Sequence, residues 1–162
     1  MIREAKPEDC VALAALSIKI WLDTYAVDGM RNEYAKYVLS NFTEEYFIGL
    51  LSNVDYRLLV SACDGVLQGF VMVNLDSYFE TRENGFEIEK LYVDEKFKGQ
   101  GLGRTLLTEV AERFGNVFWL YTWVENESNE FYKHLGFRRI GGLTFDFKGH
   151  TIANHVYKRN QT

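Results

Sequence analysis

The order of apolar and polar positions is clearest in the second half of the chain. Residues 86–93 are rich in β-branched and aromatic side chains, which predicts a strand. From about residue 101 to 114 the apolar residues recur at helical spacing, which predicts a helix. The apolar stripe of that helix consists of Leu102, Leu106, Leu107, Val110, Ala111 and Phe114. Gly115 follows the last apolar turn and should end the helix.

The rest of the chain divides into shorter elements of the same two kinds. Pro7 suits the first turn of a helix, and Thr43 suits the cap of another. Asp64-Gly65 between two β-rich runs is a strong hairpin signal. We therefore predict strands over about residues 1–5, 57–63, 66–75, 116–124, 138–147 and 152–158, and helices over about residues 7–25, 30–39, from 43 onward and 128–135.

Composition and charge narrow the class of protein. With 162 residues and 47% hydrophobic content, we expect one folded α/β domain spanning residues 1–162. The net charge of −5 argues against a nucleic-acid-binding surface. Cys10 and Cys63 lack metal-binding spacing, so no metal is expected. The N-terminus lacks an apolar signal core and no run reaches the length of a membrane span, so we expect a cytoplasmic protein with no membrane partner.

The turn between the strand and the helix of the opening paragraph is rich in glycine. It reads Lys98-Gly99-Gln100-Gly101-Leu102-Gly103, so successive backbone N–H groups at a helix start are left uncovered by side chains. Such a nest binds phosphate or pyrophosphate, although a flexible turn without a ligand is an equal alternative. The dinucleotide fingerprint would need glycine where Arg104 stands, and the Walker motif would need a different spacing.

This turn resembles the acyl-CoA loop of the GNAT N-acetyltransferase superfamily, whose pattern is Gln/Arg-x-x-Gly-x-Gly/Ala. Gly101 and Gly103 stand at the two glycine positions, and the preceding LYVDEKF passage also resembles the family. Lys98 replaces the usual Gln or Arg at the first position. It keeps a positive charge for a phosphate but loses the planar fork of arginine.

A second segment, residues 125–137, supports the same resemblance. It is similar to the family's Asn-x-x-Ala-x-x-Phe-Tyr-x-x-x-Gly-Phe motif, with Phe-Tyr and Gly-Phe in place and Ser128 where Ala is usual. The register puts Glu125 at the asparagine position. Either the preceding loop is one residue shorter, or Asn126 or Asn129 makes the polar contact to CoA.

The resemblance covers essentially the whole chain and implies the GNAT fold. That fold is a mixed, mostly antiparallel twisted sheet of about seven strands, with helices on both faces and the fourth and fifth strands splayed. The resemblance also implies acetyl-CoA as the acyl donor, with its pantetheine arm on the edge of a strand. The residues expected around the donor are Leu91, Tyr92, Val93, Lys98, Gly99, Gln100, Gly101, Leu102, Gly103, Arg104, Asn126, Asn129 and Tyr132.

The acceptor is expected to be a small-molecule amine. The segment Trp21 to Tyr25 looks like the first helix of the polyamine and small-amine branch, so Trp21 and Tyr25 are expected to contact the acceptor. Their helical spacing with Tyr34 and Tyr37 is also typical of a core. Acetylation of a protein N-terminus or lysine is an alternative, and a non-catalytic acyl-CoA-binding module is another. Homodimers are common in the family, so a homodimer is compatible with the resemblance.

Three residues are expected to carry the chemistry. Glu87 and Glu89 are two apart on one strand and should share a face, and we favour Glu89 over Glu87 as the base, acting through water. An ordinary solvated face beside Lys90 is the alternative for this pair. Tyr132 resembles the family's general acid, and the alternative is that it only packs beside Phe131. The three histidines form no site; His155 is expected to be a strand residue with its hydrogen bonds satisfied.

Overall fold

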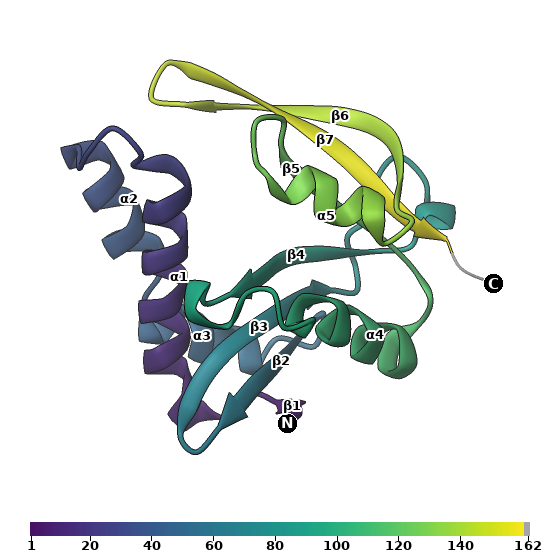
Figure 1. Ribbon diagram of the computed structural model, residues 1–162, viewed down its shortest axis with the longest axis horizontal. Coiled ribbons are helices and arrows are strands. Elements are labelled where there is room, and N and C mark those ends of the chain that lie inside the picture. Colours follow the sequence, from purple (N-terminus) through teal and green to yellow (C-terminus); the bar gives the residue numbers. More distant parts are fainter. Residues whose placement is uncertain (161–162) are drawn as a thin grey trace.

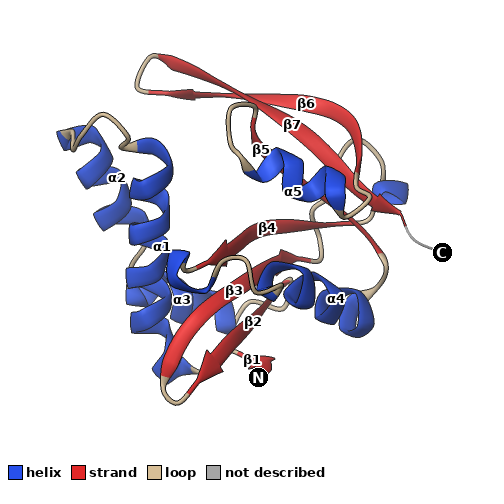
Figure 2. Ribbon diagram, in the orientation of Figure 1, coloured by secondary structure: helices blue, strands red, loops and turns tan. Residues whose placement is uncertain are grey.

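The computed structural model describes residues 1–160 and contains one seven-stranded sheet (Figures 1 and 2). The strands are β1 (Ile2–Glu4), β2 (Tyr56–Cys63), β3 (Val66–Asn74), β4 (Phe86–Val93), β5 (Val117–Trp123), β6 (Arg138–Phe147) and β7 (His150–Asn160). They lie in the order β1-β2-β3-β4-β5-β7-β6. Every neighbouring pair is antiparallel except β4 and β5, which are parallel. The predicted GNAT sheet is confirmed.

Five α-helices accompany the sheet: α1 (Cys10–Tyr25), α2 (Asn32–Asn41), α3 (Glu44–Leu51), α4 (Leu102–Phe114) and α5 (Ser128–His134). A 3-10 turn at Pro7–Asp9 leads into α1. The side chain of Thr43 accepts a hydrogen bond from the backbone N–H of Tyr46, so the predicted cap of α3 is confirmed. The second helix lies two residues later than predicted. Across residues 1–160, no helix has both the length and the apolar character needed to cross a membrane.

The helices cover the sheet according to the alternation of its strand residues. Leu58 and Val60 of β2 face α1 and α3, whereas Leu59 between them packs against α4. In Figure 1 the N-terminal helices lie together on one side and α4 and α5 on the other. The hairpin of β2 and β3 turns at Asp64 and Gly65, both with positive φ (52° and 77°), as an Asp-Gly turn requires.

The central strands β4 and β5 separate soon after they meet. Only Phe86 with Phe118 and Glu87 with Trp119 are paired in the described part of the chain. Beyond Glu87, the edge of β4 that faces β5 is therefore left open. On its other edge β4 pairs with β3, and there the register shifts between Met72–Lys90 and Val73–Ile88. Glu89 is the extra residue, so β4 has a β-bulge at this position.

The β6–β7 hairpin extends beyond the sheet toward the N-terminal helices (Figure 1). Phe147, at its tip, packs on Trp21, Tyr34 and Tyr37, with ring centroids 5.4–6.2 Å apart. These contacts join the C-terminal strands to α1 and α2 across the gap between β4 and β5.

Candidate active site

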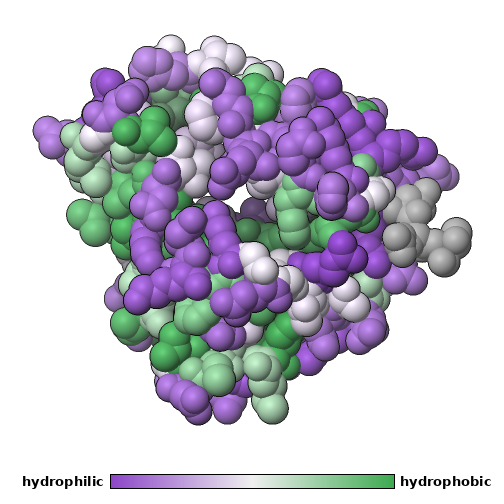
Figure 3. Space-filling model, in the orientation of Figure 1, coloured by the Kyte–Doolittle hydropathy of each residue, from purple (hydrophilic) through white to green (hydrophobic). Residues whose placement is uncertain are grey.

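The splay between β4 and β5 opens into a cleft of about 1110 Å³. A pocket for one small molecule usually has 300–1,000 Å³, so this cleft has room for more than a small ligand. In Figure 3 a hollow near the centre of the molecule shows hydrophobic residues inside and hydrophilic residues around it. The cleft is lined by α1, β4, the loop before α4, the end of β5 and α5.

The glycine-rich loop forms one end of the cleft. Gly99 and Gly101 have φ values of +81° and +79°, and a Cβ at either position would meet no atom within 4 Å. The loop therefore turns its bare backbone to open space at the start of α4, as a phosphate site requires. Gly103 lies closer to its surroundings, because a Cβ there would come within 3.0 Å of Phe131 on α5.

The basic residues predicted in this loop occupy different positions. The ammonium of Lys98 lies 3.1 Å from Glu95 and 3.8 Å from Glu127, so it joins the loop before α4 to the loop before α5. All three side chains are exposed, and such pairs are weak enough to yield to a phosphate. Gln100 and Arg104 are exposed and do not line the cleft, unlike the other loop residues predicted.

The open edge of β4 passes through the middle of the cleft. Leu91, Tyr92 and Val93 all line it, and they follow the last residue of β4 that pairs with β5. Free backbone groups on such an edge can bind an extended amide-containing arm. The glycine loop and this edge together fit an acyl-CoA donor.

Glu89 projects into the cleft from the bulge of β4. Its Oε2 accepts a hydrogen bond from the hydroxyl of Tyr56 at 2.7 Å and another from Nδ2 of Asn74 at 2.9 Å. Two donors on one oxygen fix the position of the carboxylate. Its other oxygen has no hydrogen bond within residues 1–160.

Glu87 lies under the surface of the cleft. It is 7% exposed, and its Oε1 accepts a hydrogen bond from the hydroxyl of Ser77 at 2.7 Å. Burial raises the pKa of Glu87 to about 7, with a smaller upward contribution from Glu89, against the lowering effects of Ser77 and Lys90. Glu87 therefore has a pKa suited to a base at neutral pH but does not line the cleft, whereas Glu89 does.

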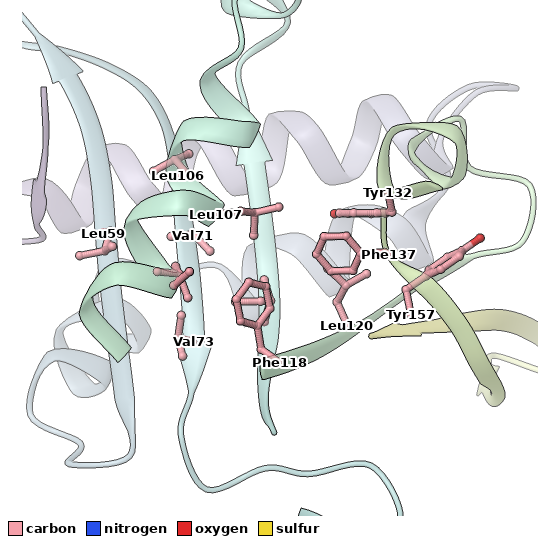
Figure 4. Close-up of a cluster of buried hydrophobic side chains, with 13 residues drawn as sticks. Leu59, Val71, Val73, Leu106, Leu107, Phe118, Leu120, Tyr132, Phe137 and Tyr157 are labelled. Carbon is pink, nitrogen blue, oxygen red and sulfur yellow. The ribbon is translucent and has the colours of Figure 1, made fainter. Parts of the chain in front are cut away.

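Tyr132 lines the cleft from α5. Its ring packs against Phe131, Phe137 and Tyr157, at centroid distances of 5.2–6.1 Å. In Figure 4 the oxygen end of Tyr132 is turned away from α5, toward the side of Leu107 on α4. Burial raises the pKa of the phenol, so it holds its proton at neutral pH. Tyr132 therefore packs beside Phe131 and also lines the cleft, so a packing role does not exclude a role in the cleft.

The two candidate asparagines have different surroundings. Asn126 lines the cleft, and its Oδ1 accepts a hydrogen bond from the backbone N–H of Ser128. Asn129 is buried: its amide donates to the backbone oxygens of residues 123, 124 and 126, and its Oδ1 accepts from the hydroxyl of Tyr157. Asn129 thus holds the turn before α5 together, and of the two asparagines only Asn126 lines the cleft.

The other side of the cleft is aromatic. Trp21 and Tyr25, both predicted to meet the acceptor, line it with Tyr37 and Phe42. Trp21 stacks on Tyr37 at 4.8 Å and tilts against Tyr25 at 4.7 Å. Tyr34 instead packs on Phe147, outside the cleft lining. Trp21, Tyr25 and Tyr37 therefore pack together as a small core and also form one wall of the cleft.

The expectation for one histidine was wrong. His155 on β7 is half-buried, and its Nδ1 is buried without a hydrogen-bond partner in the described part of the chain. Burial and the charges of Arg139 and Lys133 lower its pKa. His134 and His150 are exposed, and none of the three histidines lines the cleft.

Comparison with known proteins identifies the family. The model of the Acetyltransferase (GNAT) family matches residues 19–137. The chain belongs to this family. The GNAT chain is also 28% identical over 152 residues to an uncharacterized N-acetyltransferase from the pepI 3′ region of Lactobacillus delbrueckii subsp. lactis, a match that covers 89% of this chain and 87% of the relative. As a member of this family, the chain is an acyltransferase.

Solved structures share its fold at low sequence identity. The ribosomal-protein-alanine N-acetyltransferase of Brucella melitensis has a TM-score of 0.73 at 22% identity, with 99% of both chains covered. PaiA N-acetyltransferase of Thermoplasma acidophilum, in complex with coenzyme A, has a TM-score of 0.70 at 20% identity, with 96% of both chains covered. YncA of Salmonella typhimurium, with acetyl-CoA, has a TM-score of 0.64 at 22% identity, with 98% of this chain and 91% of that chain covered.

Sequence reasoning missed several residues of this GNAT site. Tyr56 and Asn74, which hold Glu89, come from two other strands, and only the register of β2, β3 and β4 brings them together. Lys90 also lines the cleft, although neighbouring residues of a regular strand face opposite ways. The bulge that allows this has no sequence signal of its own.

Proposed function

We propose that the GNAT chain transfers the acetyl group of acetyl-CoA directly to a primary amine of a small molecule. The observation that carries this proposal is the cleft itself: Glu89 and Tyr132 line it together with the open edge of β4. A base for the acceptor and an acid for the leaving group are thus available beside the place where the donor fits. The proposal assigns Glu89 to the proton of the amine and Tyr132 to the sulfur.

The proposed step balances as follows. The amine nitrogen forms a bond to the carbonyl carbon of the acetyl group, and the bond from that carbon to the CoA sulfur breaks. The amine must first lose a proton, which passes to Glu89 through water. The departing thiolate takes a proton from the hydroxyl of Tyr132. The nitrogen of the adduct loses its second proton as the adduct collapses, and this proton restores the hydroxyl of Tyr132 through water. Backbone N–H groups near Leu91 to Val93 are the proposed donors to the carbonyl oxygen.

The site must help the acceptor ammonium to lose its proton. For an amine with an ordinary pKa of about 10.4, forming the neutral amine at pH 7 costs about 4.6 kcal/mol of free energy. The half-buried acceptor end and its aromatic wall remove water from the ammonium, which lowers this cost. The hydrogen bonds from Tyr56 and Asn74 hold Glu89 in place to receive the proton.

The proposed class of acceptor follows from the shape of this end. Aromatic faces at Trp21, Tyr25 and Tyr37 attract a cation, which fits a small amine and includes the polyamines predicted from the sequence. Phe147 packs on the same cluster and bridges α1 and α2 to the C-terminal hairpin. A wall closed in this way favours a small acceptor over a peptide chain.

A thiol-release assay with acetyl-CoA tests the proposal. The panel contains monoamines, polyamines, amino acids, aminoglycosides and short peptides with free N-termini or lysines. We expect CoA to be released with at least one small amine and with much lower efficiency for the peptides. Release with peptides alone would favour the protein acetyltransferase, and binding of acetyl-CoA without any release would favour the non-catalytic module.

A further inference from the structure

The cleft contains a lysine that the proposed reaction does not use. Lys90 follows Glu89 directly, and both residues line the cleft; Nζ of Lys90 lies near the ring of Phe42, another lining residue. In a regular strand they would face opposite sides, and the bulge at Glu89 is what brings them together. The strand thus presents one carboxylate and one ammonium side by side at the acceptor end.

The ammonium of Lys90 makes no direct ion pair with a carboxylate in the described part of the chain. Within residues 1–160 it takes part in no ion pair at a limit of 4.0 Å, and its Nζ lies 5.5 Å from the ring centroid of Phe42. The side chain is only half-exposed. Burial lowers the pKa of Lys90, and the nearby charges of Glu89 and Glu87 offset this only in part. An anion that arrives at the ammonium would relieve the remaining cost of burying the charge.

The other charged residues that line the cleft are exposed. Glu95 and Glu127 surround Lys98 at the donor end. Asp23 and Glu125 line the cleft but are exposed. Glu89 and Lys90 are therefore the half-buried charged pair among the lining residues of the described chain, and Phe42 and Tyr37 line the cleft with them.

We propose that the acceptor is an amino acid, whose carboxylate pairs with Lys90 while its amine meets Glu89. This inference rests on the proposed small-amine acetyltransferase function and narrows it. An acceptor with opposite charges close together matches the two neighbouring side chains. A polyamine instead would bring further positive charge toward Lys90, so the pair selects against the polycation that the sequence suggested.

Matched pairs of acceptors test the role of the carboxylate. The pairs are leucine with 3-methylbutylamine, phenylalanine with phenethylamine, and lysine with cadaverine, which differ only by that group. For wild type we expect kcat/KM to favour at least one amino acid over its decarboxylated partner by about 10-fold or more, the usual effect of a charged hydrogen bond. Lys90→Met keeps the length of the side chain without the charge and should abolish this preference, and Lys90→Arg should restore part of it. Lys36→Gln removes a charge from the exposed surface of α2 and should leave the preference unchanged.

Calorimetry of the same pairs with the CoA-saturated protein separates this inference from the proposed function. If the amino acid binds more tightly than its partner through Lys90 but no acceptor releases thiol, the carboxylate site at Lys90 stands as a binding site and the proposed function is wrong. A preference for the decarboxylated amines or for spermidine, or a carboxylate preference that Lys90→Met leaves unchanged, would overturn the inference. So would the absence of binding and turnover for every amino acid tested.

Discussion

Two carboxylates only two residues apart on β4 have different environments. Glu87 is buried against Ser77 with a pKa of about 7, whereas Glu89 reaches the cleft and is held by Tyr56 and Asn74. Burial disfavours the charged form of Glu87. Glu87 therefore has the pKa of a general base, whereas Glu89 is the carboxylate that can meet an acceptor.

The raised pKa of Glu87 has a consequence for stability. The folded protein holds this proton up to about pH 7, whereas the ordinary value is 4.5. Stability is therefore lost as pH rises through this window, by about 3 kcal/mol in total above pH 7. Glu87→Gln keeps an oxygen for Ser77 without the charge. Urea unfolding should show it more stable than wild type by up to about 3 kcal/mol at pH 8.5 and nearly equal at pH 4.5.

Exposed Glu112→Gln is the matched control for that experiment and should change little at either pH. An equal effect of Glu87→Gln at both pH values would show that Glu87 is not protonated near neutrality in the folded protein.

Glu89→Gln tests the proton relay. Glutamine can still accept the hydrogen bonds of Tyr56 and Asn74, but it cannot take a proton from the acceptor. We expect the largest loss of rate below the pKa of the amine and a shrinking defect toward pH 9–10, where the neutral fraction of an amine with a pKa of about 10.4 rises from about 4% to about 30%. Glu87→Gln should show a weaker form of this profile or none. A defect of the same depth at every pH would contradict the relay, and a raised KM with unchanged kcat would indicate that Glu89 only holds a cation.

Tyr132→Phe tests the proposed acid. The ring stays in its packing against Phe131 and Phe137, and only the proton for the leaving thiolate is lost. Turnover should fall about 100-fold or more while the affinity for acetyl-CoA is kept. Tyr78→Phe, at an exposed site away from the cleft lining, is the control. Unchanged turnover in the Tyr132 variant would leave this residue with a packing role only.

At the scale of elements, the loop before α4 is predicted to bind the pyrophosphate. Gly101→Asp places a Cβ at a left-handed position and a negative charge in the nest, so acetyl-CoA binding measured by calorimetry should collapse. Gly149→Asp is a matched control, because Gly149 has a similar φ of +85° and equally open space but lies in the β6–β7 turn. Equal affinity in the two variants would contradict the loop assignment.

The elements also show what the sequence can and cannot predict. Asp64-Gly65 predicted the β2–β3 hairpin because this turn depends on two residues alone. The helical spacing of the apolar residues in 101–114 predicted α4 because that face packs against a single core. The bulge at Glu89 could not be predicted, since it arises from the pairing of β4 with β3. The structural role of Asn129 could not be predicted for a similar reason. Its partner Tyr157 lies 28 residues away, and no local pattern links the two.

At the scale of the whole molecule, the separation of β4 from β5 brings the proposed functions together. The donor end is built by the glycine loop and the open edge of β4, and the acceptor end by α1, α2 and the bulge. Phe147 of the β6–β7 hairpin packs on Trp21 of α1 and Tyr37 of α2, so the C-terminal strands contact the N-terminal helices. The central claim is that donor and acceptor occupy this cleft at the same time, so that the acetyl group passes directly between them.

A bisubstrate ligand tests that claim most directly. CoA is joined through an acetyl bridge to the amine of the best acceptor in the thiol-release panel, and its affinity is compared by calorimetry with that of CoA alone. If both ends lie in one cleft, the linked ligand should bind about 100-fold or more tightly, because its second half binds without a second loss of translational freedom. Gly101→Asp and Lys90→Met should each weaken it, from opposite ends. An affinity no greater than that of CoA would contradict a shared cleft and direct transfer.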